Sequence, residues 1–146
     1  MAKTTILVVD AQGGGLGRQL VAGIKKLAGK IGRADVCVEA VGTNSIATAA
    51  MLKAGADAAA TGENSVVVAC RSADLIVGPI GIVIADAMLG EITPKMAAAV
   101  AQAPARRILI PFQHCDTCIV GVSDGTVSRL TAEALERVEE HLTVNV

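Results

Sequence analysis

A glycine-rich stretch at residues 10–18 (Asp-Ala-Gln-Gly-Gly-Gly-Leu-Gly-Arg) constrains the fold of this chain more than any other feature. An apolar run at residues 5–9 leads directly into it, and a helical pattern of apolar residues at positions 16, 20, 24 and 27 follows it. Strand, glycine turn and helix in this order are the context in which a glycine motif indicates nucleotide binding. The unpaired N–H groups and the positive dipole end of a helix N-terminus suit a phosphate. The stretch therefore predicts a site for a phosphate-bearing ligand, formed by Asp10, Gln12, Gly13, Gly14, Gly15, Leu16 and Gly17.

Known glycine fingerprints fit this stretch only in part. The dinucleotide pattern G-x-G-x-x-G fits with Gln12 in place of its first glycine, followed by Gly14 and Gly17. The short-chain dehydrogenase pattern T-G-x-x-x-G-x-G fits with Asp10 in place of threonine, and its last two glycines fall on Gly15 and Gly17. A Walker phosphate loop is excluded, because no Gly-Lys-Ser/Thr follows. The alternative is a plain tight turn, although three consecutive glycines exceed what such a turn needs.

Composition indicates a single domain, residues 1–146, with an aliphatic core. Hydrophobic residues make up 52% of the chain, but Phe112 is the one aromatic residue, so Val, Ile, Leu, Ala and Met must build the core. The net charge of −1 offers no general attraction to nucleic acid or to an anionic membrane. The apolar run at residues 75–85 is too short to span a bilayer. Four cysteines without a secretory signal predict free thiols in a reducing cytoplasm.

Hydrophobic runs and turn residues predict alternating strands and helices. We expect strands at residues 4–9, 34–41, 74–77, 106–110 and 117–122, and helices at residues 15–28, 46–53, 63–71, 94–103 and 128–142. Residues 82–89 are ambiguous between helix and strand, and a helix is favoured because no turn signal interrupts them.

This alternation predicts a Rossmann-like three-layer α/β sandwich, in which helices cover both faces of a mostly parallel sheet. The connection between the last two predicted strands, residues 111–116, is too short for a parallel crossover. We therefore expect residues 117–122 to form an antiparallel edge strand, in a five-stranded sheet of order 2-1-3-4-5. Ligands of such sheets bind at the carboxyl ends of the strands, at the switch point between strands one and three.

A second glycine turn follows the third predicted strand and is expected to face the first across that switch point. It contributes Gly78, Pro79, Ile80 and Gly81 as a wall of the nucleotide site. The alternative is that this turn only ends a buried strand.

The end of the second predicted strand lacks the acidic residue that commonly holds the ribose hydroxyls of a dinucleotide. Glu39 lies two residues too early. Thr43 and Asn44 could hydrogen-bond a ribose or phosphate, or could only cap the next helix. Asp86 and Glu91 could enter the cleft, although lone carboxylates on a helix are more often solvated or capping. The nucleotide, NAD(P) or another, therefore stays open.

A C-x-x-C motif formed by Cys115 and Cys118, with His114 beside it, indicates either a redox dithiol or part of a metal site. A tetrahedral site needs four ligands, and Asp116 would be a poor fourth. The alternative is two unrelated thiols, one of them buried in the last strand.

The motifs at residues 10–17, 42–48, 60–64, 78–82 and 90–96 together resemble a family of short bacterial proteins known only as a domain of unknown function. This resemblance covers nearly the whole chain and implies a small cytoplasmic Rossmann-like protein, without an established reaction. A more distant resemblance is to the nucleotide-binding half of short-chain dehydrogenases. Their catalytic Tyr-x-x-x-Lys cannot be present, because the chain has no tyrosine.

Three functional hypotheses remain on the sequence alone. The favoured one is a nucleotide- or dinucleotide-binding protein that acts with a protein partner or as a sensor. The others are a small NAD(P)- or thiol-dependent redox enzyme, and a metal- or thiol-binding protein whose glycine loop is only structural. Only 18% of residues are charged, and the segments 81–89 and 94–103 offer water little polar surface. This shortage of charge predicts a homo-oligomer, most simply a two-fold dimer.

Overall fold

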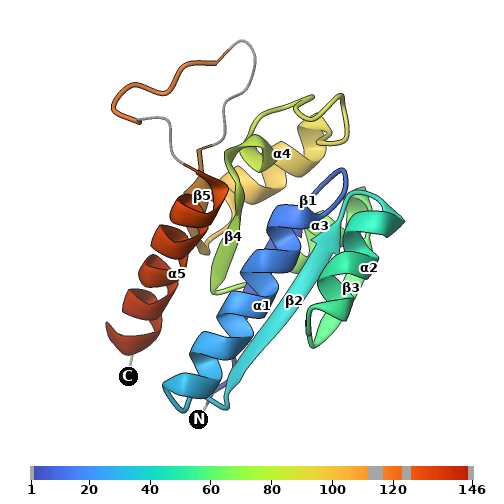
Figure 1. Cartoon of the computed structure of the whole chain (residues 1–146). Coiled ribbons are helices and arrows are strands. Elements are labelled where there is room, and N and C mark those ends of the chain that lie inside the picture. The colour runs from blue at the N-terminus through green and yellow to red at the C-terminus, as the bar shows by residue number, and fades with distance from the viewer. Residues whose placement is uncertain (1, 112–116, 123–125, 145–146) are drawn as a thin grey trace.

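The computed structural model describes residues 2–111, 117–122 and 126–144 of the chain (Figure 1). Its strands are β1 (Thr4–Asp10), β2 (Val36–Gly42), β3 (Ala58–Thr61), β4 (Leu75–Pro79) and β5 (Arg106–Ile110). Its helices are α1 (Gly15–Lys30), α2 (Ser45–Lys53), α3 (Glu63–Cys70), the short 3₁₀ helix η1 (Ile80–Val83), α4 (Pro94–Gln102) and α5 (Val127–Val144).

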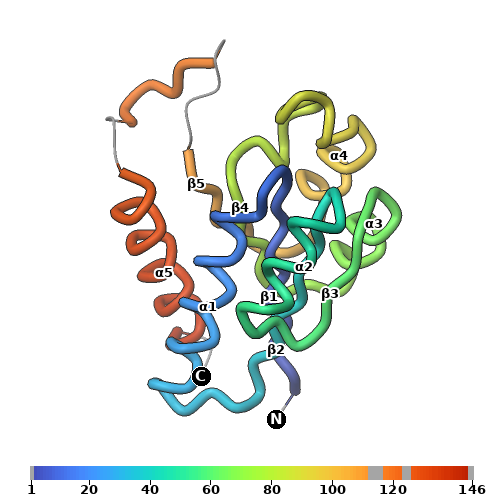
Figure 2. Tube along the Cα trace, turned by 45° about the vertical axis from the view of Figure 1, so that its right-hand side comes forward, coloured from blue at the N-terminus to red at the C-terminus, as the bar shows by residue number. Residues whose placement is uncertain are grey.

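The five strands form one parallel sheet in the order β3-β2-β1-β4-β5. Helix α1 packs against α2 and α5, and α3 packs against α4. Figure 2 shows α5 beside α1, away from α3 and α4. The expected three-layer α/β fold is therefore confirmed.

Strand β1 is the centre of the sheet, and its side chains alternate between two cores as the pleat requires. Ile6 and Val8 join the core under α1, α2 and α5, whereas Leu7 and Val9 join the core under α3 and α4. All four side chains are essentially inaccessible to solvent. A strand buried on both faces reads as a continuous apolar run, which is why β1 is recognisable in the sequence.

Three expectations about secondary structure are wrong. Residues 117–122 form no strand of the sheet, so the described residues contain no antiparallel edge strand, and β5 is an edge of the sheet. The fifth strand of the sheet is instead β3, which is not among the expected strands. Its sequence Ala-Ala-Ala-Thr carries little strand propensity, and its pairing with residues 39–42 of β2 makes it a strand. For the other four strands, the predicted order is confirmed as β2-β1-β4-β5.

Residues 82–89, for which a helix was favoured, do not form an α-helix. Helix η1 ends at Val83, and turns follow to residue 92. The backbone φ angles of Asp86, Met88 and Leu89 are 65°, 55° and 57°, in the left-handed region. No α-helix can continue through such residues. The segment is therefore a compact loop between η1 and α4, which we call the 84–93 loop.

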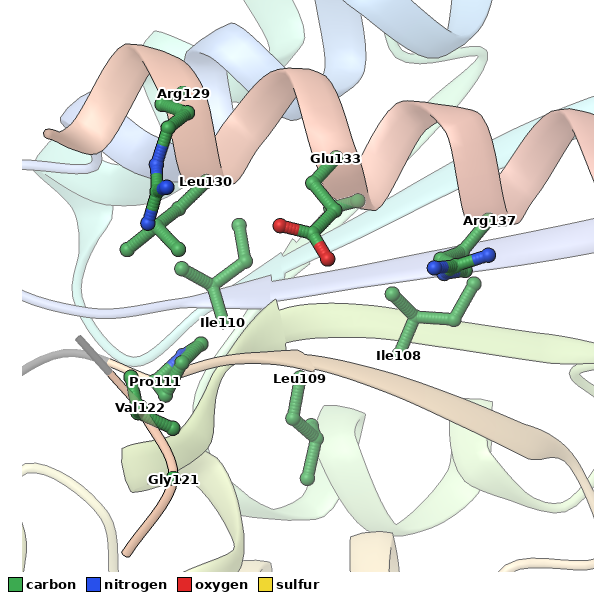
Figure 3. A pocket seen from close by; sticks show the side chains of 11 residues that line it. Ile108, Leu109, Ile110, Pro111, Gly121, Val122, Arg129, Leu130, Glu133 and Arg137 are labelled. Carbon is green, nitrogen blue, oxygen red and sulfur yellow. The ribbon is translucent and has the colours of Figure 1, made fainter. Parts of the chain in front are cut away.

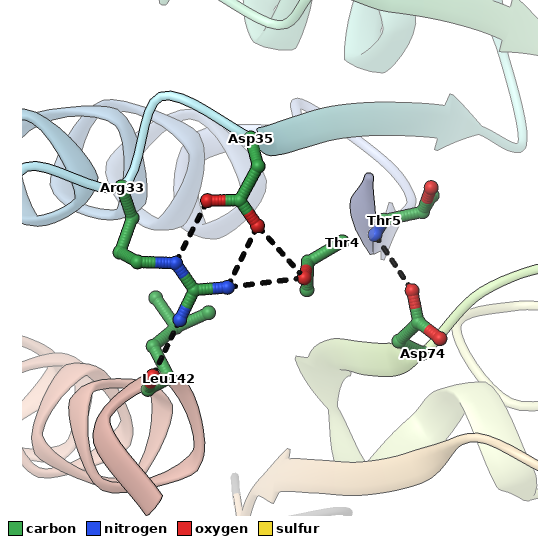
Figure 4. A network of polar contacts seen from close by, with 6 residues as sticks. All are labelled: Thr4, Thr5, Arg33, Asp35, Asp74 and Leu142. Atoms are coloured by element: carbon green, nitrogen blue, oxygen red, sulfur yellow. Dashed lines mark hydrogen bonds and ion pairs between the residues drawn. The ribbon is translucent and has the colours of Figure 1, made fainter. Parts of the chain in front are cut away.

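A polar clamp at the amino edge of the sheet ties three segments together (Figure 4). The Arg33 guanidinium donates to both carboxylate oxygens of Asp35, at 2.8 and 2.7 Å, and to Thr4 Oγ1 at 3.2 Å. It also donates to the carbonyl of Leu142 in α5. The guanidinium holds the pKa of the Asp35 carboxyl well below its usual range. This clamp lies at the opposite end of the strands from the glycine loop and links β1, the residues before β2 and α5.

Candidate functional site

The glycine loop joins the carboxyl end of β1 to α1, and a buried carboxylate closes it. Asp10 Oδ1 accepts a hydrogen bond from the N–H of Ala11 at 2.8 Å, and Oδ2 accepts one from the N–H of Gly17 at 2.7 Å. Burial raises the pKa of the Asp10 carboxyl, and these two N–H donors oppose that effect. Asp10 is therefore a structural acceptor that holds the loop against the first turn of α1.

Two of the loop glycines are required by packing. Gly14 has a φ of 71°, and a Cβ there would lie 2.7 Å from the Cα of Ala47. A Cβ on Gly17 would lie 2.6 Å from Met51 Sδ and 2.8 Å from Asp10 Cβ. Both contacts are closer than real Cβ atoms show, so these glycines let α1 and α2 approach the sheet.

Gly13 and Gly15 are different, because a Cβ on either would meet no atom within 4 Å. The N-cap residue of α1, Gly14, makes no side-chain cap, and the first turn carries no acidic residue. Within the part of the chain that the structure describes, the N–H groups of Gly13, Gly15 and Leu16 donate no hydrogen bond. This side of the loop thus combines open space with unpaired donors at a helix N-terminus.

Thr43 and Asn44, at the end of β2, lie beside the glycine loop. Asn44 caps α2 through Oδ1, which accepts from the N–H of Ala47 at 2.9 Å, and its Nδ2 donates to the carbonyl of Gln12 at 2.9 Å. The N–H of Thr43 donates to the carbonyl of Asp10 at 3.1 Å. The capping role expected for Asn44 is therefore present, and the same side chain also reaches the glycine loop.

Glu91 completes this arrangement from the 84–93 loop. Its Oε1 accepts hydrogen bonds from Thr43 Oγ1 at 2.7 Å, from Asn44 Nδ2 at 2.7 Å and from the N–H of Gln12 at 3.0 Å. The hydrogen bond from the Thr43 hydroxyl is the main reason why the pKa of Glu91 lies below its ordinary value. Sequence analysis allowed Glu91 to enter the cleft, but it favoured a solvated or capping role and did not include Glu91 among the site residues. The signal that could have found it is the absence of any carboxylate at the end of β2.

The second glycine turn occupies the expected position beside β1 but differs in local structure. Gly78 and Pro79 belong to β4, and Ile80 and Gly81 begin η1. A Cβ on Gly78 would lie 2.5 Å from the carbonyl oxygen of Val9, so this glycine permits close contact between β4 and β1. The turn therefore has a clear structural role.

The thiol motif is described only in part, since His114 and Cys115 lie outside the described residues. Cys118 is free and exposed, and Cys37 is free and partly buried. Cys70 is free and buried, and burial raises the pKa of its thiol to about 11, which makes it a poor nucleophile. Outside the segments 112–116 and 123–125 and the chain ends, no three His, Cys, Asp or Glu side chains are grouped to hold a metal ion.

A separate hollow of about 450 Å³ lies between β5 and α5 (Figure 3). Arg129, Glu133 and Arg137 of α5 line one side, and Ile108, Ile110 and Pro111 line the other. None of the hydrogen bonds of the glycine loop involves these residues. The hollow is thus distinct from the site at the switch point.

The fold defines a class, small α/β proteins with a five-stranded parallel sheet flanked by helices, and the glycine-rich loop follows the central strand β1. Within that class, residues 5–143 match the family described as Domain of unknown function (DUF3842), and the chain belongs to this family. No curated protein matches the chain. The resemblance to an uncharacterised family is confirmed, whereas the distant relation to short-chain dehydrogenases stays a prediction. None of the described helices has the length and hydrophobicity needed to cross a membrane.

Proposed function

We propose that this protein binds a nucleotide or dinucleotide at the carboxyl edge of β1 and β4, with a phosphate on the glycine loop. The observation that carries the proposal is the open side of the loop. Gly13 and Gly15 leave space for a ligand, and the N–H groups of Gly13, Gly15 and Leu16 have no partner among the described residues. Unpaired N–H groups at a helix N-terminus are suited to a phosphate.

The local backbone supports an anion at this position. Gln12 has a φ of 53° and Gly14 a φ of 71°, and consecutive N–H groups in such left-handed turns can form a concave anion site. The sheet order is that of the first five strands of dinucleotide-binding folds, with the loop at the switch point.

The carboxylate of Asp10 is the main argument against a phosphate, because two negative charges repel each other. The hydrogen bonds of Asp10 show that it does not occupy the donors proposed for the phosphate. Each of its oxygens accepts from a backbone N–H, those of Ala11 and Gly17. Neither is one of the N–H groups left open on Gly13, Gly15 and Leu16. Burial also raises the pKa of Asp10, which disfavours its charged form. Asp10 therefore shapes the loop without occupying its open donors.

Calorimetric titration with NAD, NADP, ATP, GTP and flavins tests the proposal, using the wild type, Gly15→Val and Gly29→Val. A valine at position 15 would place a branched side chain where the phosphate must approach the backbone. We expect it to abolish binding and to preserve the fold. Gly29→Val is the matched control, because Gly29 lies in the same helix and also has open space around it. Equal binding by wild type and Gly15→Val would overturn the assignment.

The same proposal includes the cellular compartment and the assembly state of the protein. The free thiols of Cys37, Cys70 and Cys118 fit a reducing bacterial cytoplasm. The solvent-facing alanines of α4, Ala98 and Ala101, leave room for close contact with another chain, and the protein would act as a homodimer or with a protein partner. The redox alternative would need the exposed Cys118 near a bound nicotinamide or flavin, and the described hydrogen bonds of the glycine loop do not include Cys118.

A further inference from the structure

Glu91 offers a carboxylate at a point where a nucleotide site needs an acceptor. In dinucleotide-binding folds, an acidic residue after the second strand holds the ribose hydroxyls. In this chain β2 ends at Gly42, and Thr43 and Asn44 follow without a carboxylate. The Glu91 side chain lies against both residues and against the N–H of Gln12, so it brings a carboxylate to the end of β2 from another segment.

The 84–93 loop holds Glu91 in place through its own backbone. The N–H of Asp86 donates to the carbonyl of Ile92 at 2.7 Å, and the N–H of Ile92 donates to the carbonyl of Ala87 at 3.2 Å. Ile92 is fully buried, which anchors the residue next to Glu91 in the core. A carboxylate on such a support can act as a preorganised acceptor.

The hydrogen bonds to Glu91 leave one of its two carboxylate oxygens available to a ligand. All three converge on Oε1, and no described residue donates to Oε2. A carboxylate has about four acceptor positions over its two oxygens. The hydrogen bonds from the Thr43 hydroxyl, the Gln12 N–H and the Asn44 amide lower the pKa of Glu91. The side chain is therefore ionised near neutral pH and can only accept hydrogen bonds.

We propose that Glu91 is the specificity-determining residue of the nucleotide site, where it accepts hydrogen bonds from the ribose hydroxyls and rejects a 2′-phosphate. This inference rests on the proposed nucleotide-binding function. The groups that hold Glu91 are a hydroxyl, a carboxamide and a backbone N–H, all of them neutral. Among the described residues, no Lys or Arg forms an ion pair with it. A 2′-phosphate would therefore meet an uncompensated negative charge, whereas sites that take one supply an arginine.

Titration with NAD and NADP, which differ only in the 2′-phosphate, tests this assignment. We expect the wild type to bind NAD more tightly than NADP by about tenfold to a hundredfold, the effect of one charged hydrogen bond. Glu91→Gln keeps the size of the side chain, and its amide oxygen can replace Oε1 as the acceptor of the three hydrogen bonds, so the fold should survive. It should weaken NAD binding and strengthen NADP binding until the two affinities converge. Glu136→Gln on the exposed face of α5 is the control that removes a charge elsewhere, and it should leave the NAD preference unchanged.

The outcomes separate this inference from the proposed function. If the wild type binds NAD and NADP equally, or if Glu91→Gln weakens both by the same factor, the specificity role is overturned and nucleotide binding stands. If the wild type binds neither ligand nor any nucleotide of the wider screen, the proposed function fails and this inference fails with it.

Discussion

The carboxylate of Asp10 and the backbone N–H of Gly17 are joined by a hydrogen bond of 2.7 Å that closes the glycine loop. This bond links the last residue of β1 to the first turn of α1, across a sequence separation of seven residues. The same two residues are so close that a Cβ on Gly17 would lie 2.8 Å from Asp10 Cβ. The loop geometry thus depends on an acceptor at one position and on the absence of a side chain at the other.

Gly17→Ala should therefore destabilise the protein, because its methyl group would overlap with Met51 Sδ and Asp10 Cβ. We expect the free energy of unfolding to fall by about 1–3 kcal/mol, as for overpacked cores. Urea unfolding measures the change. The control is Gly29→Ala, in open space on the exposed side of α1, which should be neutral or stabilising by about 0.5–1 kcal/mol. Equal stability of the two variants would contradict the packing role of Gly17.

The carboxyl groups of Asp10 and Glu91 should titrate on opposite sides of their ordinary values. Burial raises the pKa of Asp10, and the Thr43 hydroxyl lowers the pKa of Glu91. The folded protein binds the Glu91 proton less readily than the unfolded chain. The stability that this group supplies is therefore present above the ordinary glutamate pKa of about 4.3 and is lost as the pH falls through its lowered pKa.

The contribution of Asp10 to stability depends on pH in the opposite direction, because the folded protein binds the Asp10 proton more readily than the unfolded chain. Its contribution to stability falls as the pH rises through its raised pKa. NMR titration of the side-chain carboxyl carbons measures both groups, and Thr43→Val should move the Glu91 midpoint upward. Midpoints of Asp10 and Glu91 on the same side of their ordinary values would contradict this prediction.

The clamp around Arg33 should contribute to stability more than an exposed ion pair does. The side chains of Arg33 and Asp35 are 13% and 10% exposed, whereas those of Lys25 and Asp57 are 38% and 39% exposed. Arg33→Met leaves the Asp35 carboxylate without its main partner, and Lys25→Met disturbs only a solvated pair. We expect a larger drop in the urea midpoint for Arg33→Met. A drop of the same size in both variants would show that the clamp stabilises the protein no more than an exposed ion pair does.

The thiols should differ sharply in reactivity. Cys118 is exposed and should react with a small thiol reagent in the native protein within minutes, whereas Cys70 should react only after unfolding. The reason is that burial both shields the Cys70 sulfur and raises its thiol pKa to about 11. Mass spectrometry of the labelled peptides identifies the reactive sites. Native labelling of Cys70 at the rate of Cys118 would be incompatible with this structure.

The homodimer stays a prediction, with α4 as its candidate interface. Met96, Ala97 and Val100 of α4 are buried, and Ala98 faces solvent. Light scattering after gel filtration should give a dimer mass for the wild type and a monomer mass for Ala98→Glu, because a buried charge at a two-fold contact is costly. Circular dichroism checks that the variant is folded. A monomeric wild type at micromolar concentration would exclude the dimer.

The sequence by itself determined the features that depend on local pattern. The apolar run before Asp10, the three glycines after it and the helical spacing from Leu16 onward specify β1, the loop and α1. The alternation of such units then leads to a sheet with helices on both faces, because strands that are buried on both sides need cover. The position of the glycine loop at the carboxyl edge also follows from these patterns.

Tertiary structure alone decided the features that depend on distant partners. The alanines of β3 become a strand because they pair with β2, and no local propensity signals this. Glu91 joins Thr43 and Gln12 across separations of 48 and 79 residues, and left-handed turns in the 84–93 loop, rather than the expected helix, bring it there. A local pattern cannot specify such contacts, because their free energy is gained only once the sheet has brought the ends of β1, β2 and β4 to one edge.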